Sequence, residues 1–179
     1  MNMIDKVVAA VTPSPSEEMV QAARHKAQAL AGSTGWLAKV IEHHQQIEAC
    51  FAAVKNAGSA TGQKKAQKQL GLILTGHSIA EESVIYPAMA ANGQNGNAHE
   101  LYAEQSNAKI DMAALDALEP MSQNYLDKLE HIRTAVADHI YEEESDCFPK
   151  LKASADTATQ AKLTRKYAEE FERYVHAEV

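Results

Sequence analysis

Apolar residues recur every three or four positions along most of the chain, which is the spacing of a buried face on an α-helix. Between about residues 35 and 56 this face consists of Leu37, Val40, Ile41, Ile47, Phe51 and Val54. No stretch shows the sustained alternation of β-branched and polar residues that is typical of strands. The pattern therefore predicts an all-α fold.

Capping residues and turn-forming segments divide this pattern into successive helices. Gly58 and the segment 59–62, the Asn- and Gly-rich run 92–97, and Pro120 are the clearest breaks. The predicted helices cover about residues 16–31, 35–56, 63–89, 98–118, 122–151 and 157–179. The second to fifth have the lengths and short connections of a four-helix bundle.

Composition and charge exclude several classes of protein. A chain of 179 residues is long enough for one domain with an apolar core and short for two, so we expect a single domain over 1–179. The net charge of -7 supplies no basic face for a nucleic acid. No apolar run approaches membrane-spanning length, and residues 1–11 lack the features of a signal peptide, so we expect a cytoplasmic protein with no membrane partner. Cys50 and Cys147 form no metal or disulfide pattern.

An internal repeat is the most informative feature. Residues 77–87 (HSIAEESVIYP) align without a gap with residues 139–149 (HIYEEESDCFP). The His, both Glu, the Ser, an aromatic residue and the Pro coincide. The chain therefore contains two similar segments, each with a His four residues before a Glu.

Helical phase places each His-Glu pair on its own helix's apolar face, because residues four apart share one face. The pairs are His77 with Glu81 and His139 with Glu143. An ionised carboxylate in an apolar face is costly unless a cation or a hydrogen-bonding partner compensates it. One such pair would be typical of a core histidine that binds a neighbouring Glu, but two aligned pairs indicate a metal site. Imidazole and carboxylate suit Fe, Mn or Zn, and carboxylates from two helices can bridge two ions.

A further candidate ligand, His44, lies within the apolar face of the second predicted helix. His43 immediately precedes it and is the alternative ligand. If His43 does not bind the metal, we expect it at the surface or beside the metal ligands. Glu48 lies one turn beyond His44 and could bind too, although a salt bridge at the surface is the commoner role for such a residue. We read His25, His99, His131 and His176 as surface or packing residues.

The order His44, His77/Glu81, His139/Glu143 resembles that of the hemerythrin-like HHE cation-binding family. The resemblance covers about residues 36–151 and implies an up-down-up-down four-helix bundle, with accessory helices at 16–31 and 157–179. The family has one more histidine, between the two His-Glu pairs.

Comparison of the two halves of the chain locates the position of that histidine. With His44 set against Gln105, Val40 matches Leu101 and Phe51 matches Met112, so Gln105 stands where the resemblance implies a His. An amide oxygen is a weaker donor than imidazole. The site would then hold more water or recruit a neighbour such as Tyr102, one turn away, although an ordinary core position is the commoner role for such a tyrosine.

The resemblance implies a non-haem centre of two iron ions, Fe2+ or Fe3+. An oxo or hydroxo bridge between them is compatible with this ligand set. The ligands would also suit Zn or Mn. The function implied is binding or sensing of O2, nitric oxide or peroxide, in oxygen or oxidative-stress handling. The alternative is a di-iron enzyme, a ferroxidase or a peroxide-consuming oxidoreductase, whose redox partner the sequence does not indicate. No His follows a Glu by three residues, which disfavours the ferritin-like form of that enzyme.

Overall fold

The computed structural model describes residues 14–175, and every regular element within this range is helical. The predicted all-α fold is confirmed for this part of the chain. The elements are α1 (Glu17–Ala31), α2 (Trp36–Lys55), α3 (Ala60–Ala80), η1 (Glu81–Ile85), α4 (Tyr86–Ala91), α5 (Asn95–Asp116), α6 (Gln123–Glu142), η2 (Glu143–Cys147), α7 (Phe148–Ser154) and α8 (Thr157–Val175).

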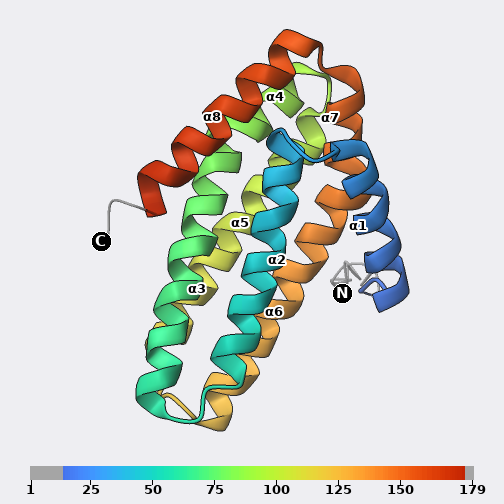
Figure 1. The fold of residues 1–179 in the computed structure, drawn as a ribbon. Helices are drawn as coiled ribbons and strands as arrows, with labels where there is room; N and C mark the ends of the chain where they lie inside the picture. Colours follow the sequence, from blue (N-terminus) through green and yellow to red (C-terminus); the bar gives the residue numbers. More distant parts are fainter. Residues whose placement is uncertain (1–13, 176–179) are drawn as a thin grey trace, which may run out of the picture.

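Helices α2, α3, α5 and α6 form a four-helix bundle, and α1 and α8 pack against different sides of it (Figure 1). Two clusters of buried apolar side chains fill the bundle. One lies around Trp36, Tyr86 and Phe148, and the other around Phe51 and Leu129. None of the helices described combines the length and apolar character that crossing a membrane requires.

Serine caps explain where several helices begin. The side chains of Ser16, Ser59 and Ser122 accept hydrogen bonds from backbone N–H groups in the first turns of α1, α3 and α6. The cap at Ser59 starts α3 three residues earlier than the sequence predicted. The segment 59–62 was therefore wrongly interpreted as a break, because Ser59 acts as a cap and Gly62 is tolerated in the first turn.

Each of the two long helices predicted over 63–89 and 122–151 is interrupted by a five-residue π-helical turn, η1 or η2. The backbone N–H of Tyr86 bonds to the carbonyl of Glu81, and that of Phe148 to the carbonyl of Glu143. A Pro follows in each case, and Pro both lacks an N–H and crowds the carbonyl four residues before it. The wider turn accommodates this constraint, so the repeated sequence produces a repeated backbone distortion.

Helix α8 lies along α3, with close contact at Gly76. A Cβ atom at Gly76 would lie 3.0 Å from Cγ2 of Val175 and 3.6 Å from the ring of Phe171. Glycine at this position therefore lets α8 approach α3 one residue before His77. The predicted helix over 157–179 is observed as far as Val175, and His176 lies outside the described residues.

Candidate metal centre

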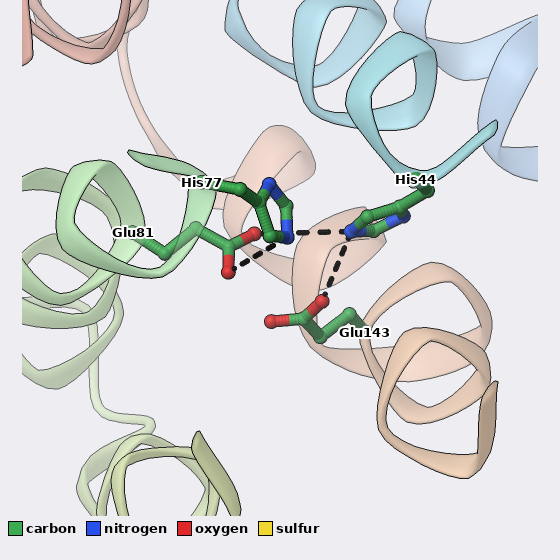
Figure 2. A group of neighbouring side chains, drawn as sticks. All are labelled: His44, His77, Glu81 and Glu143. Atoms are coloured by element: carbon green, nitrogen blue, oxygen red, sulfur yellow. Dashed lines mark ion pairs between the residues drawn. The ribbon is translucent and has the colours of Figure 1, made fainter. Parts of the chain in front are cut away.

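Four buried side chains meet between the helices of the bundle. His44 comes from α2, His77 from α3, Glu81 from the start of η1 and Glu143 from the start of η2 (Figure 2). One nitrogen or oxygen atom from each lies within 4.8 Å of those from the other three. Nε2 of His44 is 3.2 Å from Oε2 of Glu143, and Nε2 of His77 is 3.2 Å from Oε2 of Glu81. Four of the residues that helical phase singled out are thus brought together in space, and the fifth, His139, is not part of this cluster.

The donor atoms of this cluster fit a cation. Nε2 of His44, Oε1 of Glu81 and Oε2 of Glu143 are buried, and none of them has a hydrogen-bond partner of suitable geometry. Unpaired buried polar atoms are rare and costly. Because nitrogen and carboxylate oxygen are both ligands for iron, manganese and zinc, one bound ion would satisfy all three atoms.

The two carboxylates of the cluster differ in acidity. Burial, together with the nearby charge of Glu143, raises the pKa of Glu81 to about 7. The pKa of Glu143 is lowered instead, because His139 and His44 outweigh the effect of its burial. In the metal-free protein Glu143 therefore carries its charge, whereas Glu81 takes up a proton near pH 7, and a bound cation would replace that proton.

His44 is oriented by a chain of charged groups that begins on α1. Its Nδ1 lies 2.8 Å from Oε1 of Glu144, and the guanidinium of Arg24 contacts the same carboxylate at 3.0 Å. Burial opposes a positive charge on His44, but Glu143, Glu144 and Glu81 together raise its pKa. Since Nδ1 is engaged by Glu144, Nε2 is the nitrogen left to face the cluster.

His77 is oriented in the same way by α8. Its Nδ1 lies 3.0 Å from the hydroxyl of Tyr167, which also lies 2.8 Å from Nδ1 of His43. The ring of Phe171 stacks on His43 with centroids 3.6 Å apart. Burial lowers the pKa of His43 to about 4, so this imidazole is neutral near pH 7. His43 thus does not join the cluster of four but supports it through Tyr167.

A second group of polar atoms surrounds the hydroxyl of Tyr86. That hydroxyl lies 2.8 Å from Oε1 of Glu143, and 3.3 Å from both Oε2 of Glu81 and Nε2 of His139. The amide Nε2 of Gln105 donates to the same hydroxyl at 2.6 Å and to Oε2 of Glu81 at 2.7 Å. These groups lie beside the first cluster and share its two carboxylates.

His139 is held by Glu104, whose carboxylate lies 2.7 Å from Nδ1. Burial opposes a charge on His139, but Glu143 and Glu104 raise its pKa to about 10. Glu104 directly precedes Gln105 on α5 and so points about 100° away from it. The structure keeps it away from the cluster of four and makes it a hydrogen-bonding partner of His139.

The sequence analysis missed Tyr86. In an uninterrupted α-helix a residue five positions after Glu81 points well away from it, at about 100° per residue. The π-helical turn adds one residue to this turn of the helix, which returns Tyr86 to the face of Glu81. The signal was in the repeat: Tyr86 aligns with Phe148, so only one half of the repeat carries a hydroxyl at this buried position.

Two other candidate ligands lie away from the cluster. Tyr102 is part-exposed, and its hydroxyl donates to the backbone carbonyl of Glu82 at 2.6 Å, within the π-helical turn. The side chain of Glu48 is 43% exposed and pairs with Arg24 at 2.7 Å. The structure therefore brings neither residue to the centre, and the tyrosine that reaches it is Tyr86.

Comparison with known protein families identifies the family of this chain. The Hemerythrin HHE cation binding domain matches residues 37–151, which is more than half of the chain. The chain belongs to this family. The hemerythrin HHE match spans α2 to α7, and so contains His44, both His-Glu pairs, Tyr86 and Gln105, but neither Arg24 nor Tyr167.

A curated relative shares part of this hemerythrin HHE region. It is the DNA nickase of Nostoc sp. (strain PCC 7120 / SAG 25.82 / UTEX 2576), 28% identical over 131 residues. The alignment covers 72% of this chain and 35% of the relative, so the chain spans about a third of that protein's length. No solved structure gives a significant match to the chain.

Proposed function

We propose that this hemerythrin HHE protein holds two iron ions and binds or senses O2, nitric oxide or peroxide at them. The observation that carries the proposal is the set of three buried atoms without hydrogen-bond partners, Nε2 of His44, Oε1 of Glu81 and Oε2 of Glu143. Two of these atoms belong to carboxylates, whose charge in a buried site needs a cation or a proton to neutralise it. Iron is the metal because the family resemblance implies it.

The two groups of polar atoms correspond to two metal positions. His44, His77, Glu81 and Glu143 would hold the first ion. The second would lie on the side of His139 and the other oxygens of Glu81 and Glu143, with Tyr86 as an oxygen donor. Iron at such positions supplies electrons to O2 or peroxide, or reversibly binds a small ligand.

The remaining polar groups support small-ligand chemistry. The amide of Gln105 lies against Tyr86 and Glu81, and its own Oε1 has no hydrogen-bond partner. A neutral amide where the family has an imidazole leaves the second position with a weaker ligand. That position is therefore the one we expect to exchange solvent for a small molecule.

Metal analysis and optical spectroscopy test this function. The protein as isolated, and after anaerobic reconstitution with ferrous iron, should bind two equivalents of iron per chain. Reduction followed by exposure to O2, nitric oxide or peroxide should change its absorption spectrum, and removal of O2 should reverse the oxygen-dependent change. His77→Ala and His139→Ala should each reduce the bound iron, whereas His99→Ala, at an exposed histidine of α5, should not. Binding of less than one equivalent in the correctly folded wild type would refute the metal function.

A di-iron enzyme is the second candidate, and one observation favours it. Acidic side chains of Glu104, Asp111 and Asp138 line a cavity that reaches His139, and such a surface attracts ferrous ions. Catalytic oxidation of added ferrous iron beyond two equivalents, or sustained consumption of peroxide with a supplied reductant, would favour the enzyme. A spectral change without turnover would favour binding or sensing.

DNA nicking is not part of the proposal. The relative named a DNA nickase is matched over only 35% of its length. This chain carries a net charge of -7, which opposes binding to a phosphate backbone.

A further inference from the structure

The two halves of helix α8 contact different parts of the molecule. The first half, residues 157–166, is anchored on Trp36 at the start of α2. The indole Nε1 of Trp36 donates to Oε1 of Gln160 at 2.6 Å, and its backbone N–H donates to Oγ1 of Thr164 at 3.0 Å. The second half, residues 167–175, lies along α3 (Figure 1).

The second half of α8 is held to the bundle mainly by one side chain. Tyr167 is fully buried, whereas every residue from 168 to 175 is exposed or part-exposed. Phe171 and Val175 pack against the bundle but stay part-exposed. The ion pairs described in this half join residues of α8 to one another. A segment with so few buried contacts opens locally at a low cost in free energy.

Tyr167 connects this half of α8 to the metal centre. Its hydroxyl lies 3.0 Å from Nδ1 of His77 and 2.8 Å from Nδ1 of His43, on which the ring of Phe171 stacks. The other nitrogen of His77 belongs to the cluster of four. Opening of the second half would therefore take the hydrogen-bonding partner away from a candidate metal ligand.

A bound metal selects one arrangement of these hydrogen bonds. With Nε2 of His77 on a metal, the imidazole proton lies on Nδ1, which then donates to the hydroxyl of Tyr167. That hydroxyl donates in turn to Nδ1 of His43. Without metal, Nε2 of His77 lies 3.2 Å from Oε2 of Glu81 and can carry the proton itself, so that Nδ1 becomes an acceptor.

Metal binding and the position of this half of α8 affect each other. Loss of a partner that holds a ligand imidazole typically costs about 10–100-fold in metal affinity. Coupling between two equilibria is reciprocal. If docked Tyr167 strengthens metal binding by this factor, bound metal lowers the population of the open form of α8 by the same factor.

We propose that residues 167–175 dock in response to occupancy of the metal site and are the element through which the protein reports that occupancy. In the metal-bound chain they are closed over His43 and His77. In the metal-free chain they open and close while the first half of α8 stays anchored at Trp36. The proposal rests on the metal binding in the proposed function, but not on iron or on a particular small ligand. Because α8 lies outside the residues that match the family, this coupling is an addition to the hemerythrin HHE region.

Hydrogen exchange measured by mass spectrometry on the full-length chain tests the coupling. The metal-free chain is compared with the chain loaded with Zn2+ or, under anaerobic conditions, with ferrous iron, and metal analysis gives the amount bound. Peptides that cover residues 167–175 should exchange about 10–100-fold more slowly with metal bound. The change in peptides from residues 157–166 should be smaller, because Trp36 anchors them in both forms.

Two tyrosines in the same half of α8 give matched variants. Tyr167→Phe keeps the buried ring and removes the hydroxyl, so most of the metal-dependent slowing should be lost. Tyr174 is 39% exposed, and Tyr174→Phe should keep the full wild-type response. Circular dichroism should show the same helix content in both variants.

The outcomes separate this proposal from the proposed function. Bound metal without slower exchange of residues 167–175 would overturn the coupling and leave the metal function standing. The same slowing in Tyr167→Phe as in the wild type would also overturn it, since metal would then stabilise the whole fold rather than α8 through Tyr167. A correctly folded chain that binds neither Zn2+ nor ferrous iron would refute the metal function, and the coupling with it.

Discussion

The hydroxyl of Tyr86 lies 2.8 Å from Oε1 of Glu143, although the two residues belong to different halves of the repeat. Burial and the two carboxylates Glu143 and Glu81 raise the pKa of this phenol. In the metal-free protein Tyr86 is therefore a hydrogen-bond donor to the carboxylates. A bound cation would reverse the electrostatic balance and favour the phenolate.

Tyr86→Phe tests whether Tyr86 is a ligand. Ferric iron bound by a phenolate gives a visible charge-transfer absorption, so the oxidised wild type should show this band and the variant should lack it. Loss of the oxygen donor should also lower bound iron from two equivalents to about one, because His139 and Gln105 remain as the principal ligands outside the shared carboxylates. Metal analysis and an optical spectrum measure both effects.

Tyr102→Phe is the matched control for that substitution. Tyr102 lies one turn from Gln105, but its hydroxyl donates to the carbonyl of Glu82. We expect the band and the iron content to be unchanged. If the charge-transfer band survives in Tyr86→Phe and disappears in Tyr102→Phe, the ligand is Tyr102 and not Tyr86.

Helical periodicity was sufficient to predict the helices of the bundle and the face on which each His-Glu pair lies. His77 with Glu81, and His139 with Glu143, are four residues apart, so their shared faces follow from the sequence alone. The match of Gln105 to His44 placed it correctly next to the centre. Metal binding by these residues stays a prediction.

Helical periodicity could not predict the roles of Tyr86, Tyr167 and Arg24, for physical reasons. Tyr86 is displaced in phase by the π-helical turn that precedes Pro87. Tyr167 and Arg24 act from α8 and α1, far from the motif in sequence, and such long-range contacts leave no periodic signal. Glu144 lies next to Glu143 in the repeat but off the ligand face, and its contact with Nδ1 of His44 joins two different helices.

Tyr167→Phe should weaken metal binding without unfolding the protein. The substitution removes the oxygen that holds Nδ1 of His77, and loss of such a partner typically costs 10–100-fold in metal affinity. Competition with a chelator measures this change. The free energy of unfolding of the metal-free protein should change by only about 1 kcal/mol, the net value of a hydrogen bond.

Tyr125→Phe provides the control. Tyr125 is also fully buried and also donates a hydrogen bond, but to Gln67 at the other end of the bundle. Its loss should affect stability to a similar extent and leave metal affinity unchanged. Equal effects of the two substitutions on metal affinity would show that Tyr167 acts through general packing.

Arg24→Leu should destabilise the protein strongly. The side chain of Arg24 is 7% exposed and that of Glu144 is 1% exposed, so the substitution removes the guanidinium from a buried carboxylate and leaves it with His44, which Glu143 and Glu81 also contact. Loss of one partner of such a pair costs about 3–5 kcal/mol. Urea denaturation of the metal-free chain measures the change in the free energy of unfolding.

Two further variants separate charge from packing at this site. Glu144→Gln in the Arg24→Leu background removes the carboxylate charge that has lost its guanidinium and should recover part of the lost stability. Arg133→Leu, at an exposed pair with Glu130, should change the free energy of unfolding by no more than about 1 kcal/mol. A small effect of Arg24→Leu alone would show that His44 is sufficient to compensate the charge of Glu144, or that Glu144 is neutral in the folded protein.

The stability of the metal-free protein should fall as the pH rises from 7 to 9. His139 has a pKa raised to about 10 in the folded protein, because Glu143 and Glu104 outweigh its burial, against an ordinary value of 6.5. Over this range the folded state binds more protons than the unfolded state, so the free energy of unfolding decreases with pH, by about 2 kcal/mol from this group. The raised pKa of His44 acts in the same direction. Urea denaturation at each pH, in the presence of a chelator, measures the slope.

Comparison with two other forms isolates the cause of this slope. His139→Gln removes the group that titrates, so its slope should be smaller than that of the wild type, while contributions from cysteine ionisation remain in both. In the metal-loaded protein the ligand imidazoles are held neutral, and metal affinity should rise with pH over the same range because binding displaces protons. Stability of the metal-free wild type that rises between pH 7 and 9 would show that His139 is neutral in the folded state and that its contacts with Glu104 and Glu143 do not hold a charge.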